Sequence, residues 1–311
     1  MFSENSFPFV MQAISRWSDG SRLWLANNIP WLFDPDGKIA LGRQSKALVA
    51  WLTTNGEWFF DRLAFTISQI IKAMLFVLQA PPPLVVILAI TAIAYLLRRS
   101  VAIAVFTAAG LLLIVNQGYF KETTETLALV LASTAVSMLF GVPLGIAAAR
   151  RPWAYSAMRP VLDLMQTIPT FVYLIPALIL FGLGMVPGLI ATVIFAIPAP
   201  IRLTRLGIIS TPPALVEAAV AFGATPIQVL RKVELPFAMP QIMAGLTQTI
   251  MLSLSMVVIA ALVGASGLGV PVVRALNTVN IAKGFEAGLC IVILAIILDR
   301  MFRTSDAGDD A

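Results

Sequence analysis

Residues 217–236 read EAAVAFGATPIQVLRKVELP and form a polar, basic segment between two long apolar runs. The segment carries too many charges to cross a bilayer. Its signals for starting and ending helices are too regular for a simple linker. A segment of this kind is expected at the membrane surface, where it can meet a partner in water. The apolar runs on either side of it define the rest of the fold.

The composition indicates an integral membrane protein. Of the 311 residues, 59% are hydrophobic and 12% are charged, and the mean hydropathy is +0.91. Soluble domains carry about 25% charged residues. Histidine, the commonest general base and metal ligand, is absent, and the single cysteine, Cys290, cannot form a disulfide within the chain. The net charge of +5 reflects basic residues at the ends of apolar runs, which membrane topology explains better than nucleic-acid binding.

The apolar runs predict an all-α fold with about seven transmembrane helices, since each span needs roughly 20 apolar residues. The predicted spans are residues 84–97, 101–117, 126–149, 160–182, 187–201, 241–264 and 285–300. Before them, residues 57–80 have one apolar helical face and Lys72 in the middle, a pattern typical of an amphipathic helix on the membrane surface.

Residues 1–56 are mixed and rich in turn signals. Trp17, Trp24 and Trp31 recur every seven residues, as indoles that anchor a helix at the interface would; a substrate-binding cage is the alternative. The chain therefore divides into an extracytoplasmic extension (1–56), an amphipathic helix (57–80) and two extra spans (81–118). A five-helix core (119–303) with a polar loop at 202–240 follows, and residues 304–311 form a cytoplasmic tail.

The distribution of lysine and arginine predicts the orientation. Alternating the loops puts eleven basic residues on one side: Arg98, Arg99, Arg150, Arg151, Arg159, Arg202, Arg205, Arg231, Lys232, Arg300 and Arg303. Lys121, Arg274 and Lys283 fall on the other side. The side rich in basic residues is cytoplasmic by the positive-inside rule. We therefore expect the N-terminus outside, and the C-terminus and the loop at 202–240 in the cytoplasm.

The polar segment has its own helix signals. Thr211, followed by a proline, predicts the N-cap of a short helix that Gly223 ends. Thr225 and Gln228 form the pattern of a capping box and start a second helix, which we expect Leu235-Pro236 to end. The predicted product is helix, tight turn, helix: a compact element with an apolar stripe of Leu215, Ala218, Ala219 and Phe222.

The spacing of Glu217-Ala218-Ala219, Gly223 and Val233-x-Leu235-Pro236 resembles the EAA loop of ABC importer permeases, with valine where isoleucine is commoner. In that family the loop docks the ATPase subunit; an ordinary amphipathic surface loop is the alternative. The resemblance implies docking roles for Glu217, Ala218, Ala219, Phe222, Gly223, Leu235 and Pro236.

Four further stretches resemble permeases of the glycine betaine, proline betaine and choline branch of this family: residues 143–150, 158–184, 242–269 and 291–300. The resemblance implies a type I importer core of five helices in a bacterial inner membrane. It also implies cytoplasmic ATPase subunits that bind ATP and Mg²⁺, an extracytoplasmic substrate-binding protein, surrounding lipid, and a second permease copy, most simply in a homodimer.

The chain itself is not expected to be an enzyme or to hold a cofactor. Its one Gly-Lys pair, Gly37-Lys38, lacks the earlier glycine of a phosphate-binding loop, so a separate subunit must supply the energy. The expected cargo is a compatible solute used in osmoprotection; another amino acid or amine, such as proline or histidine, is the alternative. An ion-coupled carrier would need ionisable groups within the membrane, and Asp163 is the one candidate.

Three residues are candidates for the substrate pathway. Asp163 could attract a quaternary ammonium, or could pair with Arg159 one helical turn away. Phe171 and Tyr173 follow the break at Pro169, and their rings could attract the same cation or could simply pack.

Overall fold

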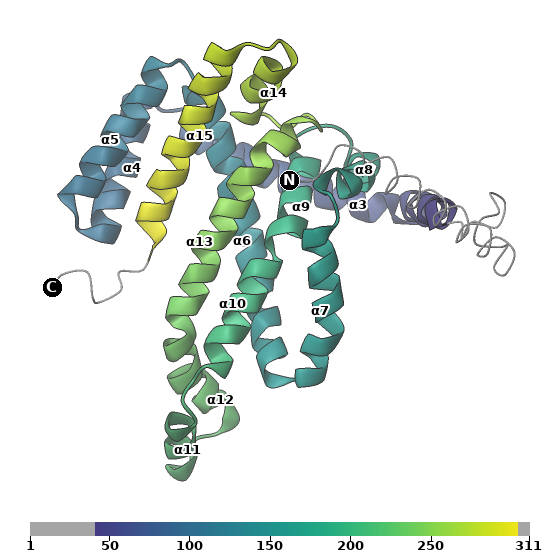
Figure 1. The fold of residues 1–311 in the computed structure, drawn as a ribbon, viewed down its shortest axis with the longest axis vertical. Helices are drawn as coiled ribbons and strands as arrows, with labels where there is room; N and C mark the ends of the chain where they lie inside the picture. Colours follow the sequence, from purple (N-terminus) through teal and green to yellow (C-terminus); the bar gives the residue numbers. More distant parts are fainter. Residues whose placement is uncertain (1–40, 304–311) are drawn as a thin grey trace, which may run out of the picture. The chain divides into compact units, whose positions relative to one another are not determined.

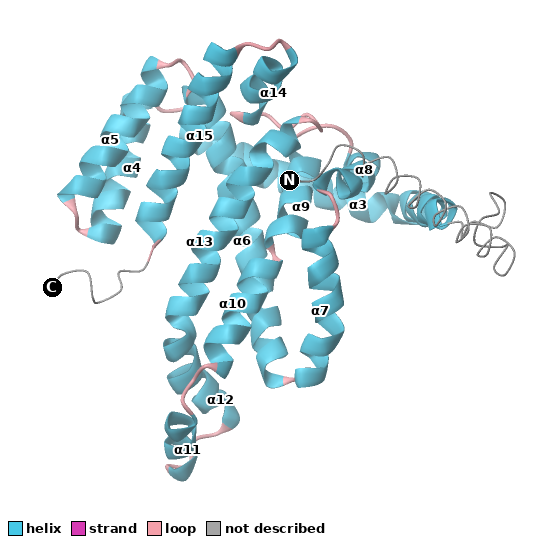
Figure 2. Ribbon diagram, in the orientation of Figure 1, coloured by secondary structure: helices cyan, strands magenta, loops and turns pink. Residues whose placement is uncertain are grey.

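The computed structural model describes residues 41–303, and every regular element in this range is a helix (Figures 1 and 2). The chain divides into two units, before and after Gly56. The helices are α3 (Leu41–Gln79), α4 (Pro83–Arg98), α5 (Val101–Asn116), α6 (Phe120–Arg150), α7 (Pro152–Thr167), α8 (Thr170–Phe181), α9 (Met185–Ala196), α10 (Pro198–Ile209), α11 (Pro213–Ala221), α12 (Pro226–Val229), α13 (Leu235–Ala261), α14 (Gly269–Asn277) and α15 (Ile281–Phe302). The tryptophan stripe at 17–31 and the tail at 304–311 lie outside the described residues.

Four helical segments of the described chain are long and apolar enough to cross a membrane by themselves: Phe120–Arg150, Met185–Ile209, Pro226–Ala261 and Ile281–Phe302. Two further pairs of helices, α3 with α4 and α7 with α8, pass the same test only as bent segments, with bends of 102° and 95°. The helix α5 is a shorter apolar helix of 16 residues. The predicted all-helical membrane fold is therefore confirmed.

Two predicted boundaries differ from the structure. The amphipathic helix expected at 57–80 begins at Leu41, because no proline lies between Leu41 and Gln79 and each glycine on the way costs a helix only about 1 kcal/mol. The span predicted at 160–182, with a break at Pro169, begins earlier, at Pro152, and its break separates α7 from α8 with a bend of 95°. Pro169 has no N–H and forces the residue before it out of the helical region, so Ile168 is extended (φ −65°, ψ 130°).

The core of the unit from Gly56 onward is the packing of α6 against α10 and α13, and small residues make it close. A Cβ added to Gly141 would approach Pro200 to 2.7 Å, and one added to Gly145 would approach the carbonyl oxygen of Ile201 to 2.7 Å. The hydroxyl of buried Ser133 also hydrogen-bonds that of Ser253 at 3.1 Å. Contacts of this kind replace the hydrophobic effect, which is weak between helices in lipid.

The two extra helices α4 and α5 pack on α15 (Figure 1). Their contact buries Ile87, Ala94, Leu111, Ile114, Cys290, Ile293 and Ile297. Cys290 lies in this apolar layer as a free thiol. At the end of the same helices, the guanidinium of Arg98 donates to the carbonyl oxygen of Arg303. The contact brings together two basic residues that the charge distribution assigns to one side of the membrane.

Candidate functional site

The polar segment leaves the helical unit at one end, between α10 and α13. Figure 1 shows α11 and α12 beyond the lower ends of these two helices. The helix α11 carries Glu217, Ala218 and Ala219 in its middle. Glu217 and Ala218 are exposed, and Ala219 is partly covered. The structure therefore presents the acidic and small residues of the loop at the surface of a projecting element.

The start of this element differs from the prediction. The helix α11 begins one residue later than expected, with Pro212 at the N-cap and no capping bond from a side chain. Thr211 is buried and its hydroxyl has no partner among the described residues. Pro213 explains the difference, because the residue before a proline is pushed out of the helical region, and Pro212 is accordingly extended (φ −56°, ψ 130°).

The turn after α11 is a Schellman motif centred on Gly223. The N–H of Gly223 donates to the carbonyl oxygen of Val220 at 2.8 Å, and that of Ala224 donates to the carbonyl oxygen of Ala219 at 3.0 Å. Gly223 has φ +82°, a backbone conformation that favours glycine. The predicted role of Gly223 in ending the first helix is confirmed.

The capping box that starts the second helix is also confirmed. The amide N–H of Gln228 donates to the Thr225 hydroxyl at 3.4 Å, and the Thr225 N–H donates to the Gln228 side-chain oxygen at 2.7 Å. These reciprocal bonds satisfy backbone donors that the first turn of any helix leaves free. The turn between the two helices is thus held from both sides.

The prediction that Leu235-Pro236 ends the second helix is wrong. The chain continues from α12 through a π-helical turn, Leu230–Glu234, directly into α13, so that Pro226–Ala261 is one helical segment of 36 residues. Pro236 is tolerated because it falls in the first turn after the π-helical stretch, where the backbone bonding pattern changes. Leu235 is half-buried and packs on a cluster that contains Ile208, Ala238 and Ile242.

An ion pair that the sequence reasoning missed anchors the element to α6. One nitrogen of Arg150, the last residue of α6, lies 2.8 Å from Glu234 Oε2 and donates to the carbonyl oxygen of Pro226 at 2.9 Å. The two side chains are 32% and 15% exposed. The opposite charges of Arg150 and Glu234 were visible in the sequence, but their 84-residue separation gave no reason to pair them.

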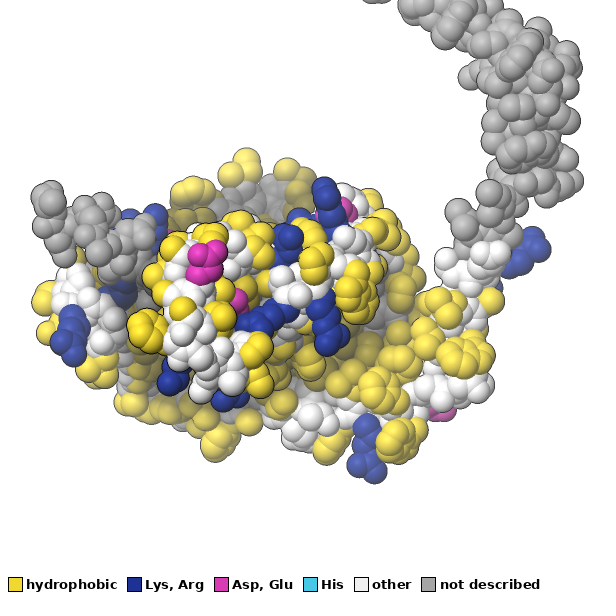
Figure 3. All heavy atoms as spheres, turned by 90° about the horizontal axis from the view of Figure 1, so that it is seen from below, with side chains coloured by type: hydrophobic (Ala, Val, Ile, Leu, Met, Phe, Trp, Pro, Cys, Tyr) yellow, Lys and Arg dark blue, Asp and Glu magenta, His cyan; other side chains and the backbone are white. Residues whose placement is uncertain are grey.

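The tip of the element is apolar and exposed. Phe222 is 93% exposed, and Leu215, Val220 and Ile227 are exposed as well. Figure 3 views this end of the molecule from below and shows apolar side chains interspersed with lysine and arginine. We call the segment Pro213–Glu234 the docking element. A projecting apolar tip set among charges is the form expected of a surface that inserts into a partner.

The three pathway candidates lie on two helices that meet at the 95° bend. Asp163 is on α7, where its carboxylate lies 2.6 Å from a nitrogen of Arg202 on α10 and 3.9 Å from Arg159. Phe171 on α8 is exposed. Tyr173 packs beside buried Leu174, and its hydroxyl has no hydrogen-bond partner among the described residues. The ion pair of Asp163 with Arg202 was not foreseen from the sequence.

Comparison with known proteins gives consistent results. Residues 141–308 match the family described as binding-protein-dependent transport system inner membrane component. The glycine betaine/carnitine transport permease protein GbuB of Listeria monocytogenes is 48% identical over 246 residues, which cover 78% of this chain and 87% of that protein. The glycine betaine transport system permease protein OpuAB of Bacillus subtilis is 46% identical over 253 residues, which cover 81% of this chain and 89% of that protein.

A third relative, the glycine betaine/proline betaine transport system permease protein ProW of Escherichia coli, is 43% identical over 263 residues, or 85% of this chain and 73% of that protein. Among solved structures, an inward-facing conformation of the MetNI methionine ABC transporter superposes with a TM-score of 0.52 and 26% identity. That match covers 58% of this chain and 90% of the other.

Proposed function

The chain belongs to the binding-protein-dependent transport system inner membrane components, and from this we infer that it is the transmembrane permease subunit of an ATP-binding-cassette importer. Its cargo is a compatible solute of the quaternary-amine class, such as glycine betaine, proline betaine or choline. The names of the relatives favour this cargo over another amino acid. The protein is a multi-pass component of the bacterial inner membrane.

The observation that carries the proposal is the docking element. It projects from the helical unit, exposes Phe222 at its tip, and continues without a break into the span formed by α13. A cytoplasmic ATPase subunit binds this tip, with Glu217, Ala218, Ala219, Phe222 and Gly223 at the contact. Leu235 and Pro236 act at its base, where they join it to α13. ATP and Mg²⁺ are bound by that partner, and the permease contributes no catalytic group.

Movement of the ATPase reaches the membrane through two connections. The helical segment Pro226–Ala261 links the docking element to the middle of the bilayer as one body. The ion pair of Arg150 with Glu234 links it to α6, which packs against α10 and α13. A displacement at the tip therefore moves α6 and α13 together, as alternation between inward- and outward-facing states requires.

Three further features complete the proposal. The docking element lies in the cytoplasm, which places the C-terminus inside and the N-terminus outside. An extracytoplasmic substrate-binding protein delivers the solute to the opposite face. A second copy of this permease completes the transport pathway as a homodimer. Support comes from the distribution of basic residues and, for the partners, from the family to which the chain belongs.

The test is ATPase association and solute uptake in proteoliposomes that contain the permease, its ATPase and its binding protein. Phe222→Asp puts a charge into the apolar contact and is expected to reduce ATPase association at least tenfold, because burying an unpaired carboxylate costs several kcal/mol. Glu217→Ala is expected to leave membrane insertion intact and to lower uptake. For ATPase association, Leu276→Asp is the matched control, since Leu276 is exposed on α14 at the end opposite the docking element. Wild-type association and uptake with Phe222→Asp would refute the docking role.

A further inference from the structure

A cavity of about 650 Å³ lies at the end of the helical unit opposite the docking element. Its walls come from three parts of the chain: Tyr119 with the first turns of α6, the turn before α14 with α14 itself, and the start of α15. None of the residues implicated above in docking or in the substrate pathway lines it.

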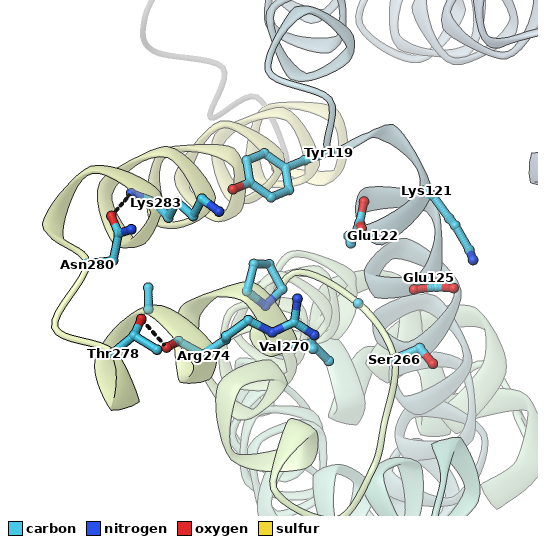
Figure 4. Close-up of a pocket in the computed structure, with 13 residues that line it drawn as sticks. Tyr119, Lys121, Glu122, Glu125, Ser266, Val270, Arg274, Thr278, Asn280 and Lys283 are labelled. Atoms are coloured by element: carbon cyan, nitrogen blue, oxygen red, sulfur yellow. Dashed lines mark hydrogen bonds between the residues drawn. The ribbon is translucent and has the colours of Figure 1, made fainter.

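Acidic side chains line this cavity from one wall, and basic side chains face them from two others. Glu122 and Glu125 come from α6, whereas Arg274 comes from α14 and Lys283 from α15. Figure 4 shows the side chains of Arg274 and Lys283 extending toward the space in front of α6. Lys121 of α6 also lines the cavity. Both acidic side chains of the cavity are therefore on the α6 wall, and the charged side chains that α14 and α15 contribute to the lining are basic.

The acidic and basic side chains do not neutralise one another. The ion pairs within residues 41–303 involve Glu234 and Asp163, so no acid of this cavity lies within 4.0 Å of a basic nitrogen. One carboxylate oxygen of Glu122 is buried and has no hydrogen-bond partner in the same range. A carboxylate that is partly buried without a counter-charge is costly, and a cation in the cavity would offset part of that cost by charge attraction.

The remaining lining suits a small ligand with methyl groups. Val270, Pro271 and Ala275 supply apolar surface. Tyr119 supplies a phenol and an aromatic ring, and rings of this kind attract quaternary cations. Burial, together with the nearby Glu286, Cys290 and Glu122, raises the pKa of Tyr119, so the phenol keeps its proton at neutral pH and can donate a hydrogen bond.

The turn that forms the floor of the cavity is held in place. The N–H of Leu268 donates to the hydroxyl of Thr126 on α6 at 2.8 Å, and Gly267 has φ +131°. A Cβ at Gly267 would meet that same hydroxyl at 2.6 Å. The backbone of this turn is thus fixed against α6, so a ligand spends little free energy on ordering the floor of the cavity.

We propose that this cavity is a binding site for a small zwitterion, whose ammonium faces Glu122 and Glu125 and whose carboxylate faces Arg274 and Lys283. A ligand with a single charge would compensate the charged side chains of one wall and leave those of the other wall without a counter-charge. The choice of glycine betaine as the probe rests on the proposed function, but the site does not: any small zwitterion with closely spaced charges complements it. On the permease, such a site receives solute at the face that meets the binding protein.

The test uses the full chain in lipid nanodiscs, without the binding protein, and isothermal titration with three probes. Glycine betaine carries both charges, choline lacks the carboxylate, and 3,3-dimethylbutyrate has the shape of betaine without the cation. Glycine betaine is expected to bind at least about tenfold more tightly than either analogue. Choline loses the charge-assisted hydrogen bonds of the carboxylate, and 3,3-dimethylbutyrate loses the attraction of the quaternary cation to the glutamates and the tyrosine ring. Glu122→Gln and Arg274→Gln are each expected to weaken betaine binding about tenfold or more.

Lys232→Gln is the matched control and is expected to leave the affinity unchanged, because Lys232 is exposed in the docking element and does not line the cavity. Arg274→Lys keeps the charge and is expected to restore most of the binding, which separates loss of the site from misfolding. Absence of betaine binding, equal binding of all three probes, or binding that survives both Glu122→Gln and Arg274→Gln would overturn the proposal. The proposed function is tested separately: it would fail if the wild-type permease, reconstituted with its ATPase and binding protein, showed no ATP-driven uptake of glycine betaine.

Discussion

The guanidinium of Arg150, at the last residue of α6, contacts the carboxylate of Glu234 and the backbone of Pro226 at the same time. This one side chain joins the end of a membrane-spanning helix to both ends of Pro226–Glu234, the part of the docking element that leads into α13. Glu234 is 15% exposed, so water screens the pair less than it screens a surface ion pair. The relation makes Arg150 a structural link between the docking element and the core.

Arg150→Gln is expected to weaken the position of the docking element by about 1–2 kcal/mol, because a hydrogen-bonded charge pair is lost and Glu234 stays partly buried. The permease should still insert and bind its ATPase. Solute imported per ATP hydrolysed, measured in proteoliposomes, should fall. Arg151→Gln is the matched control, since Arg151 is exposed and adjacent. If both variants imported the same amount of solute per ATP hydrolysed, Arg150 would not transmit movement from the docking element to α6.

Gly223→Val is expected to uncouple ATP hydrolysis from uptake while leaving insertion intact. A residue with a Cβ at φ +82° costs about 1–2 kcal/mol, and valine is worse than alanine because its branched side chain crowds the backbone. Gly118 offers a matched control: it has φ +79°, and as at Gly223 an added Cβ would meet nothing within 4 Å, but it lies in the turn before α6. Gly118→Val should carry a similar strain and keep the coupling; loss of coupling in both would point to general destabilisation.

Single cysteines are expected to label from opposite sides of the membrane. With Cys290→Ser as background, Ala221→Cys in the docking element should react with an impermeant maleimide only in inside-out vesicles. Asn277→Cys at the end of α14 should react only in right-side-out vesicles. Both positions are exposed, so access to the reagent does not limit either reaction. The opposite pattern would reverse the proposed orientation.

Asp163→Asn separates the two roles considered for this carboxylate. As the partner of Arg202 and Arg159, it stabilises the packing of α7 on α10, and its loss should lower the free energy of unfolding by about 1 kcal/mol or less, because the pair is half-exposed. The exchange Asp163→Arg with Arg202→Asp should recover part of the thermal stability. If Asp163 instead attracts the cargo, Asp163→Asn should raise the KM for uptake with little change in melting temperature.

The helical class and most of the crossing segments could be predicted from the sequence because an apolar run of about 20 residues has few alternatives to a helix in lipid. The capping box at Thr225 and the turn at Gly223 could be predicted for a related reason. Both depend on hydrogen bonds between residues three to five positions apart, so local spacing contains the whole signal.

Other features required the tertiary structure. The π-helical turn that carries the second helix past Pro236, the pairing of Arg150 with Glu234, and that of Asp163 with Arg202 all join segments or bonding patterns that local spacing does not encode. The cavity beside Tyr119 is similar, since its acidic wall comes from α6 and its basic wall from α14 and α15. In the polar segment at 217–236, the sequence by itself determined the turn at Gly223 and the capped start of the second helix at Thr225. Only the tertiary structure shows that the second helix continues into the span formed by α13 and that Arg150 of α6 anchors it. The reason is that contacts between distant residues form only when the helices that carry them have assembled.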